Sequence, residues 1–123
     1  MDSDVMLRMR VGLEAWQRGD VAALEPLLDP AVEFLWWERG EWDCHGRDAV
    51  LTCLRERAAT GRNRGEVELA EAGEDRLLGS RRAAVAEGPA AGLSPATVIA
   101  LRDGKVVSMQ QFQRLDDALA ALR

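Results

Sequence analysis

The sequence predicts an α+β fold in which a curved antiparallel sheet wraps N-terminal helices, in a single domain spanning residues 1–123. Three observations predict this class. The 123 residues are 47% apolar, which suits one globular domain with one core. Apolar residues recur at helical spacing over most of the chain up to residue 60, and at every second position over much of the remainder. Strands that cluster after helices are typical of an α+β fold.

Two helices are expected at the N-terminus. The first is predicted from apolar residues at every third or fourth position, and that series consists of Val5, Met9, Leu13 and Trp16. Gly19 is suited to end this helix, because glycine readily adopts the left-handed conformation that follows a helix. A shorter helix is expected over residues 21–28, where Pro26 limits its length, and Asp29-Pro30 is expected to be a stop.

A strand, a loop and a third helix are expected next. Residues 31–37 form an apolar run of strand length, and residues 38–46 are expected to form a loop. The third helix is predicted over residues 47–60, with Val50, Leu54 and Ala58 on its buried face.

The second half of the chain is expected to supply four strands and a final helix. The strands are predicted over residues 66–69, 76–87, 96–102 and 105–113, with a possible bulge at Gly79. Asp103-Gly104 between the last two strands is typical of a two-residue hairpin turn. Residues 115–122 are expected to form the last helix.

Composition and charge exclude several classes of partner. The 21 acidic residues outnumber the 16 basic ones, so the net charge of −5 argues against binding to nucleic acid. No apolar run approaches 18 residues, so no membrane span is expected. Because no export signal is visible, we expect a cytoplasmic location. Two cysteines, Cys44 and Cys53, are too few for a disulfide framework, and we expect both to be reduced.

Five segments, in this order along the chain, resemble the nuclear transport factor 2-like superfamily, and particularly its SnoaL-like branch. They are Leu13–Asp20, Leu28–Phe34, His45–Val50, Asp103–Val107 and Asp117–Leu119. The resemblance implies a cone: a curved sheet wraps helices and leaves a pocket at the open end. It also implies that two copies pair through the outer sheet face. The superfamily includes a steroid isomerase, an epoxide hydrolase, a dehydratase and polyketide cyclases, so the fold alone does not select a reaction.

The sequence argues against ketosteroid isomerisation. That reaction needs a carboxylate base and acidic donors that stabilise an enolate oxygen. Matching the chain to the isomerases places their tyrosine near Gly12, their base near Phe34 and their second aspartate near Ala96 or Thr97. None of these positions carries the required group, and the chain contains no tyrosine.

His45 is the only histidine, and three roles are open to it: holding the loop, lining the pocket, or acid–base catalysis. Asp43 is the nearest carboxylate in sequence that could orient its ring. Residues 43–45 include three potential metal ligands, but adjacent residues converge poorly on one ion. We therefore expect no metal and no cofactor.

Two further groups are candidates for ligand binding. Trp36, Trp37 and Trp42 lie where the resemblance places the pocket mouth, although Trp36 and Trp37 should face opposite ways on a strand. On the last strand, matched to the isomerases, the inward residues are expected to be Val107, Met109, Gln111 and Gln113. The alternative is that Gln111 and Gln113 face solvent or a partner copy.

The leading hypothesis is a SnoaL-like protein with an apolar pocket for a cyclic or hydrophobic metabolite. One alternative is a dimerisation or scaffold module with a filled cavity. Another is an acid–base isomerase, cyclase or hydrolase that uses His45 and a carboxylate. A homodimer is expected through the outer sheet face, which is predicted to carry Val106, Ser108, Gln110 and Phe112.

Overall fold

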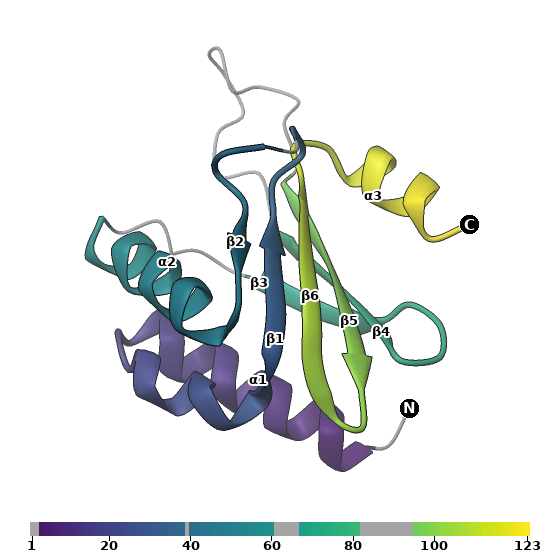
Figure 1. Cartoon of the computed structure of the whole chain (residues 1–123). Helices are drawn as coiled ribbons and strands as arrows, with labels where there is room; N and C mark the ends of the chain where they lie inside the picture. Colours follow the sequence, from purple (N-terminus) through teal and green to yellow (C-terminus); the bar gives the residue numbers. More distant parts are fainter. Residues whose placement is uncertain (1–2, 39, 61–66, 82–94) are drawn as a thin grey trace.

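A six-stranded sheet forms the frame of the structure, a computed structural model that describes residues 3–38, 40–60, 67–81 and 95–123 (Figure 1). Its strands are β1 (Leu28–Leu35), β2 (Cys44–His45), β3 (Val67–Glu71), β4 (Arg76–Arg81), β5 (Ala96–Arg102) and β6 (Lys105–Phe112). They lie side by side in the order β2-β1-β6-β5-β4-β3. The predicted α+β class is confirmed.

The sheet is mixed, which corrects the expectation of a wholly antiparallel sheet. All neighbouring strands are antiparallel except β1 and β6, which run parallel. A parallel pair needs a long connection, and here the chain between β1 and β6 contains a helix and four strands. Strand β2 is an addition to the prediction, because two residues are too few to show a periodicity.

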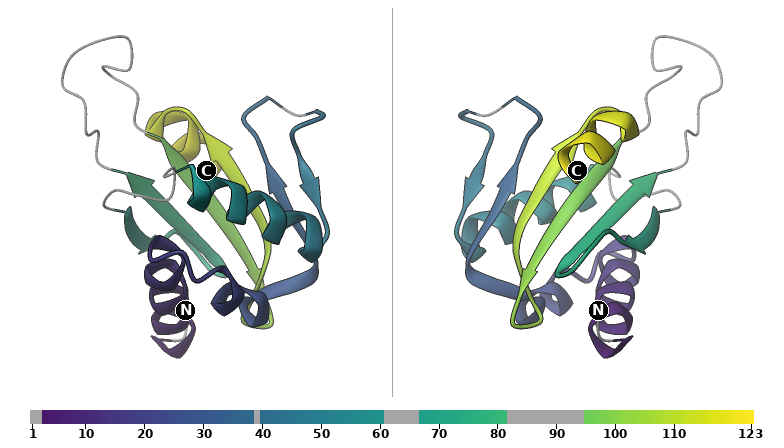
Figure 2. Two further views of the ribbon diagram at one scale, coloured as in Figure 1. Left: turned by 90° about the vertical axis from the view of Figure 1, so that its left-hand side faces the viewer. Right: turned by 90° about the vertical axis from the view of Figure 1, so that its right-hand side faces the viewer.

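The helices lie on both faces of the sheet. Helix α1 (Ser3–Gln17), the 3-10 helix η1 (Val21–Leu27) and helix α2 (Arg47–Ala59) pack together on one side, and α3 (Leu115–Ala121) packs on β5 and β6 from the other (Figure 2). The left-handed conformation of Gly19 (φ +88°) follows α1, as its position in the sequence predicts. None of the helices in the described part of the chain is long and apolar enough to cross a membrane.

Two boundaries differ from the prediction for local reasons. Strand β1 begins at Leu28, so Asp29 and Pro30 lie inside it. The pairing of β1 with β6 is irregular between Leu28 and Glu33, and a proline, which lacks the N–H, is tolerated in such a stretch. In β4, Gly79 pairs regularly with its neighbours on both sides, so the predicted bulge there is wrong. The predicted extension of β4 beyond residue 81 lies outside the described residues.

The hairpin between β5 and β6 has the predicted two-residue turn. Asp103 (φ +53°) and Gly104 (φ +78°) are both left-handed, as a type I′ turn requires. A bulge shifts the register between β5 and β6, so that Leu101 pairs with Val106 while Ala100 pairs with Ser108. Val106 is consequently buried in the core beneath the helices, and not on the outer face as expected.

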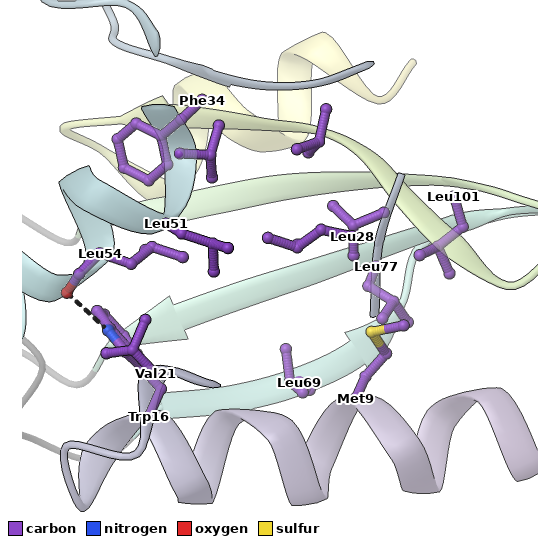
Figure 3. Close-up of a cluster of buried hydrophobic side chains, with 13 residues drawn as sticks. Met9, Trp16, Val21, Leu28, Phe34, Leu51, Leu54, Leu69, Leu77 and Leu101 are labelled. Atoms are coloured by element: carbon purple, nitrogen blue, oxygen red, sulfur yellow. Dashed lines mark hydrogen bonds between the residues drawn. The ribbon is translucent and has the colours of Figure 1, made fainter. Parts of the chain in front are cut away.

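Two apolar clusters hold the layers together. The larger one joins α1, η1, α2 and the inner face of the sheet (Figure 3). Within it, the Nε1–H of Trp16 on α1 donates to the carbonyl oxygen of Leu54 on α2 at 3.1 Å. The smaller cluster contains Ala96, Val98 and Ala118 and is packed against Phe112, where α3 covers the outer face. The sheet is thus covered on both faces near β5 and β6.

Candidate functional site

A cavity of about 440 Å³ lies between the helices and the inner face of the sheet. Most of its lining is apolar, with side chains from α1, η1, α2, β1, β3, β5 and β6. The polar side chains among the described lining residues include Arg57, Thr97, Gln111 and Gln113, and no carboxylate is among them. The cavity therefore offers a broad apolar surface with a few polar groups.

Two neighbouring strands supply a pair of polar groups to this lining. Thr97 on β5 lies directly opposite Gln111 on β6, and the Thr97 hydroxyl donates to Gln111 Oε1 at 2.9 Å. Because the amide oxygen accepts this bond, the Nε2 group of Gln111 is the part that is suited to donate to a bound molecule.

The structure brings most of the predicted ligand-binding residues to the cavity. Its lining includes Trp36, Trp37, Met109, Gln111 and Gln113. Trp42 is not part of the lining, and it is 71% exposed. Val106 takes the inward position that was expected for Val107, because of the bulge opposite β5.

Trp36 and Trp37 both line the cavity, against the expectation that at most one would face inward. Strand β1 ends at Leu35, so the alternation of a strand no longer governs the two residues after it. Their rings meet edge to face with centroids 5.1 Å apart, and Trp36 also contacts Phe34 with centroids 5.6 Å apart. The three rings form one aromatic wall.

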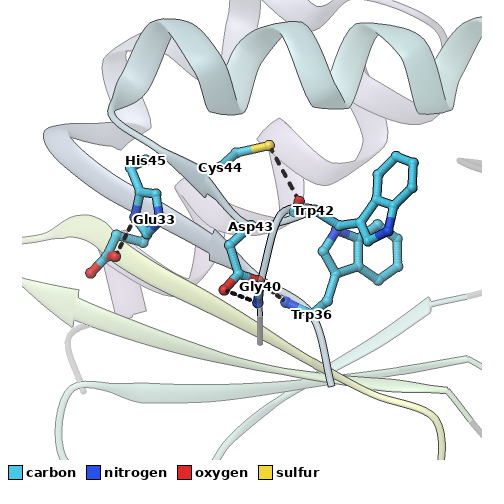
Figure 4. Close-up of polar contacts among 7 residues, drawn as sticks. All are labelled: Glu33, Trp36, Gly40, Trp42, Asp43, Cys44 and His45. Carbon is cyan, nitrogen blue, oxygen red and sulfur yellow. Dashed lines mark hydrogen bonds and ion pairs between the residues drawn. The ribbon is translucent and has the colours of Figure 1, made fainter. Parts of the chain in front are cut away.

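Asp43 organises the loop beside this wall. Its carboxylate accepts hydrogen bonds from the backbone N–H of Trp36 at 2.8 Å and of Gly40 at 3.2 Å (Figure 4). These bonds fix the chain direction after β1. Asp43 is not part of the cavity lining.

His45 is paired with Glu33, and not with Asp43 as expected from the sequence. Strand β2 places His45 opposite Glu33 on β1, and His45 Nδ1 lies 2.7 Å from Glu33 Oε2 (Figure 4). The side chains of His45 and Glu33 are 61% and 42% exposed, and neither lines the cavity. This histidine and its carboxylate partner therefore meet on the surface.

Both cysteines are free thiols. Burial and the neighbouring Cys44 raise the pKa of Cys53 from 9.0 to about 11. A raised pKa disfavours the thiolate, which is the form that reacts as a nucleophile or binds metal. Within the described ranges, no group of three His, Cys, Asp or Glu side chains could hold a metal ion.

Arg57 is a cavity residue that the sequence analysis missed. It lies on α2, seven residues after Val50 and three after Leu54, so helical spacing places it on their buried face. Its Cζ lies over the rings of Phe34 and Trp36, 5.5 and 5.3 Å from their centroids. The helical spacing of Arg57 from Val50 and Leu54 is visible in the sequence. The predicted buried face, however, continues from Leu54 to the apolar Ala58 and leaves Arg57 out.

The positions matched to the isomerases lie in different parts of the structure. Phe34, Ala96 and Thr97 line the cavity, so the places matched to isomerase carboxylates hold groups that are neutral here. Gly12 is buried against η1, where a Cβ atom would collide with Leu27. A larger residue at this position would require the Leu27 side chain to shift.

Comparisons with known proteins identify the fold. No family model and no curated protein matches the sequence. Among solved structures, a SnoaL-like protein of unknown function from Burkholderia thailandensis is similar at 18% identity with a TM-score of 0.66, covering 91% of this chain and 96% of that one. Bal32a, from a soil-derived mobile gene cassette, is similar at 19% identity with a TM-score of 0.66, covering 89% and 88%.

A third similar structure has an activity in its name. It is a LEH-like epoxide hydrolase from M. tuberculosis, at 18% identity and a TM-score of 0.63, covering 98% of this chain and 85% of that one. At such identities the likeness establishes the fold and not the reaction. The chain has the α+β fold that nuclear transport factor 2-like and SnoaL-like proteins share.

Proposed function

We propose that this protein binds a cyclic or otherwise hydrophobic small molecule in the cavity between the helices and the sheet. The observation that carries the proposal is a volume of about 440 Å³ with a mainly apolar lining and a few polar groups. Small-molecule sites typically have about 300–1,000 Å³ and this same composition. Trp36, Trp37, Met109, Gln111 and Gln113 are the proposed contact residues.

The cavity favours a binding role over the alternative of a scaffold module. A scaffold of this fold needs no internal space, and filling the cone with side chains would make it more stable. An apolar cavity of this size instead leaves apolar surface in contact with water, which is unfavourable until a ligand covers it.

The geometry gives no support to acid–base chemistry by His45. A general base must come within about 3 Å of the proton that it removes. His45 and Glu33 are paired on the surface, and the described lining of the cavity has no carboxylate. The activity in the name of the epoxide hydrolase relative is therefore not transferred to this chain.

The test is a binding screen with neutral cyclic terpenoid alcohols and ketones, followed by tryptophan fluorescence. Trp36 lies in the wall, so occupation of the cavity should change its emission. We expect Gln111→Leu to weaken the best hit about threefold to tenfold, since one neutral hydrogen bond contributes roughly 0.5–1.5 kcal/mol.

Ser108→Ala is the matched control, because Ser108 lies on the same strand but is not part of the lining. Unchanged affinity in both variants would show that the ligand does not use this face of β6. Absence of any hit would contradict the proposed function.

The assembly and location belong to the same proposal. We propose a homodimer through the outer sheet face, on which α3 lies and where Leu119 of α3 is 39% exposed. Light scattering should give twice the chain mass of 13.5 kDa, and Leu119→Glu should reduce it to one chain. A cytoplasmic location suits two free thiols, and cell fractionation tests it.

A further inference from the structure

One cross-strand pair of polar side chains lies in the mainly apolar wall of the cavity. Thr97 on β5 and Gln111 on β6 are directly opposite each other, both are half-buried, and both line the cavity. The next pair on the same face, Ile99 and Met109, is apolar and also lines the cavity. Gly79, which is paired with Thr97 on the β4 side, has no side chain that could cover the threonine. The pair therefore offers polar atoms to an otherwise apolar stretch of these strands.

The hydrogen bond within this pair leaves a donor and an acceptor unused. The Thr97 hydroxyl donates its only hydrogen to Gln111 Oε1 at 2.9 Å, so the Thr97 oxygen can still accept and Gln111 Nε2 can still donate. Among the described residues, Gln111 Nε2 has no hydrogen-bond partner, and the atom is not fully buried. Turning the amide by 180° exchanges the roles of the two residues, and the pair still offers at least one donor and one acceptor. A complementary group must therefore both accept and donate.

A hydroxyl group meets this requirement. Its oxygen can accept from Gln111 Nε2 while its hydrogen is donated to Thr97 Oγ1, which closes a ring of three hydrogen bonds. A ketone oxygen only accepts, so it would use the Gln111 donor and leave the Thr97 oxygen without a donor. We propose that the ligand is a cyclic alcohol, whose hydroxyl group binds between Thr97 and Gln111 while its ring system lies against the apolar lining. This inference rests on the proposed function, whose ligand class it specifies.

The sign of a ligand preference separates this inference from simple hydrophobic binding. An apolar cavity without the pair should favour a ketone over the matching alcohol, because a buried hydroxyl loses a donor bond to water as well as an acceptor bond. A cavity with Thr97 and Gln111 in its wall should reverse this order. The compounds 2-adamantanol and 2-adamantanone are rigid and achiral and have nearly the same shape, so they are suitable probes.

The experiment is isothermal titration calorimetry of both probes at pH 7. We expect the parent protein to bind the alcohol about threefold to tenfold more tightly than the ketone, which corresponds to one neutral hydrogen bond. Thr97→Val keeps the shape of the side chain but removes its hydroxyl, so it should abolish this preference and leave the ketone within about threefold of its parent affinity. Gln111→Met should abolish the preference and weaken both probes. Thr52→Val is the control, since Thr52 is an exposed threonine on α2 outside the lining, and it should change neither affinity.

Equal binding of both probes, or tighter binding of the ketone, by the parent protein would overturn the inference and still support the proposed function. An undiminished preference for the alcohol in Thr97→Val would also overturn it, because the hydroxyl would then bind elsewhere. Binding of neither probe would overturn the inference as well, and the neutral terpenoid screen then decides the proposed function separately. The comparison of probes in the parent needs no substitution, so it remains decisive even where a variant does not fold.

Discussion

At the scale of single residues, Trp16 makes one hydrogen bond that joins two helices. Its Nε1–H donates to Leu54 O at 3.1 Å, and both residues are buried. Trp16→Phe removes this donor and part of the ring, so we expect the free energy of unfolding to fall by about 1–3 kcal/mol in urea titrations. Trp42→Phe is the control, because Trp42 is exposed, and it should change stability by less than about 0.5 kcal/mol. Equal effects would show that the Trp16 bond contributes nothing.

Cys53 differs from an ordinary thiol in its ionisation. Its pKa is raised to about 11, first by burial and then by the neighbouring Cys44. At pH 8.5 its thiolate fraction is about a hundredfold below that of a thiol with the normal value of 9.0. We therefore expect iodoacetamide to label Cys53 in the folded protein far more slowly than in urea, as measured by mass spectrometry. Equally fast labelling would contradict the raised pKa.

The same shift makes stability depend on alkaline pH. The folded state holds the Cys53 proton more tightly than the unfolded state does. Its contribution to stability is therefore fully present below about pH 9 and is lost as the pH rises toward 11. In Cys53→Ala, the free energy of unfolding should fall less between pH 8 and pH 11 than it does in the parent protein. Parallel urea titrations at the two pH values would measure this difference.

The positions of Arg57 and Val106 in the fold could not be predicted from the sequence. Helical spacing allows Arg57 to lie on the buried face of α2. A charged residue is not expected there, however, until the aromatic rings that it contacts are known. Those neighbours, Phe34 and Trp36, come from another element. Val106 faces the core because of a bulge opposite β5, and the alternation of β6 carries no sign of that bulge.

At the scale of elements, two glycines allow a matched test. Gly104 is left-handed (φ +78°), and a Cβ there would lie 3.0 Å from Arg8 Nη2. We expect Gly104→Ala to destabilise the β5–β6 hairpin by about 1–2 kcal/mol, the cost of the left-handed conformation for other residues. A Cβ at Gly79 on β4 would make only ordinary contacts, 3.5 Å or more from its neighbours, so Gly79→Ala should be tolerated. Thermal unfolding of both variants tests this, and a reversed order would contradict it.

Long elements were predictable from sequence, and short or long-range features were not. The helices and the β5–β6 hairpin follow from periodicity and from Asp103-Gly104, whose signals are local. Strand β2 has two residues and exists only through its pairing with Glu33 and Phe34. The parallel pairing of β1 with β6 likewise depends on contacts between segments far apart in the chain. No local pattern encodes such pairings.

At the scale of the whole molecule, the cavity lies between the helices and the inner face of the sheet, and both layers contribute to its lining. The resemblance implied a pocket, but its lining depends on where β1 ends and where α2 lies. Trp36 and Trp37 both line it because they follow the strand. The aromatic wall thus depends on the three-dimensional fold. The alternation of side chains along a strand would instead have placed Trp36 and Trp37 on opposite faces.

A ligand in this cavity should stabilise the whole fold. Binding to the folded state alone adds about 2.7 kcal/mol when the ligand is at 100 times its Kd. For the best hit of the binding screen at that concentration, we expect the melting temperature to rise by about 8–16 °C, at about 3–6 °C for each kcal/mol in a chain of this size. Ile99→Trp places an indole into the space beside Ile99, which lines the cavity, and should abolish this rise. Val11→Trp adds the same group at an exposed position on α1 and should leave the rise unchanged. A full rise in Ile99→Trp, measured by scanning calorimetry, would show that the ligand binds outside the cavity.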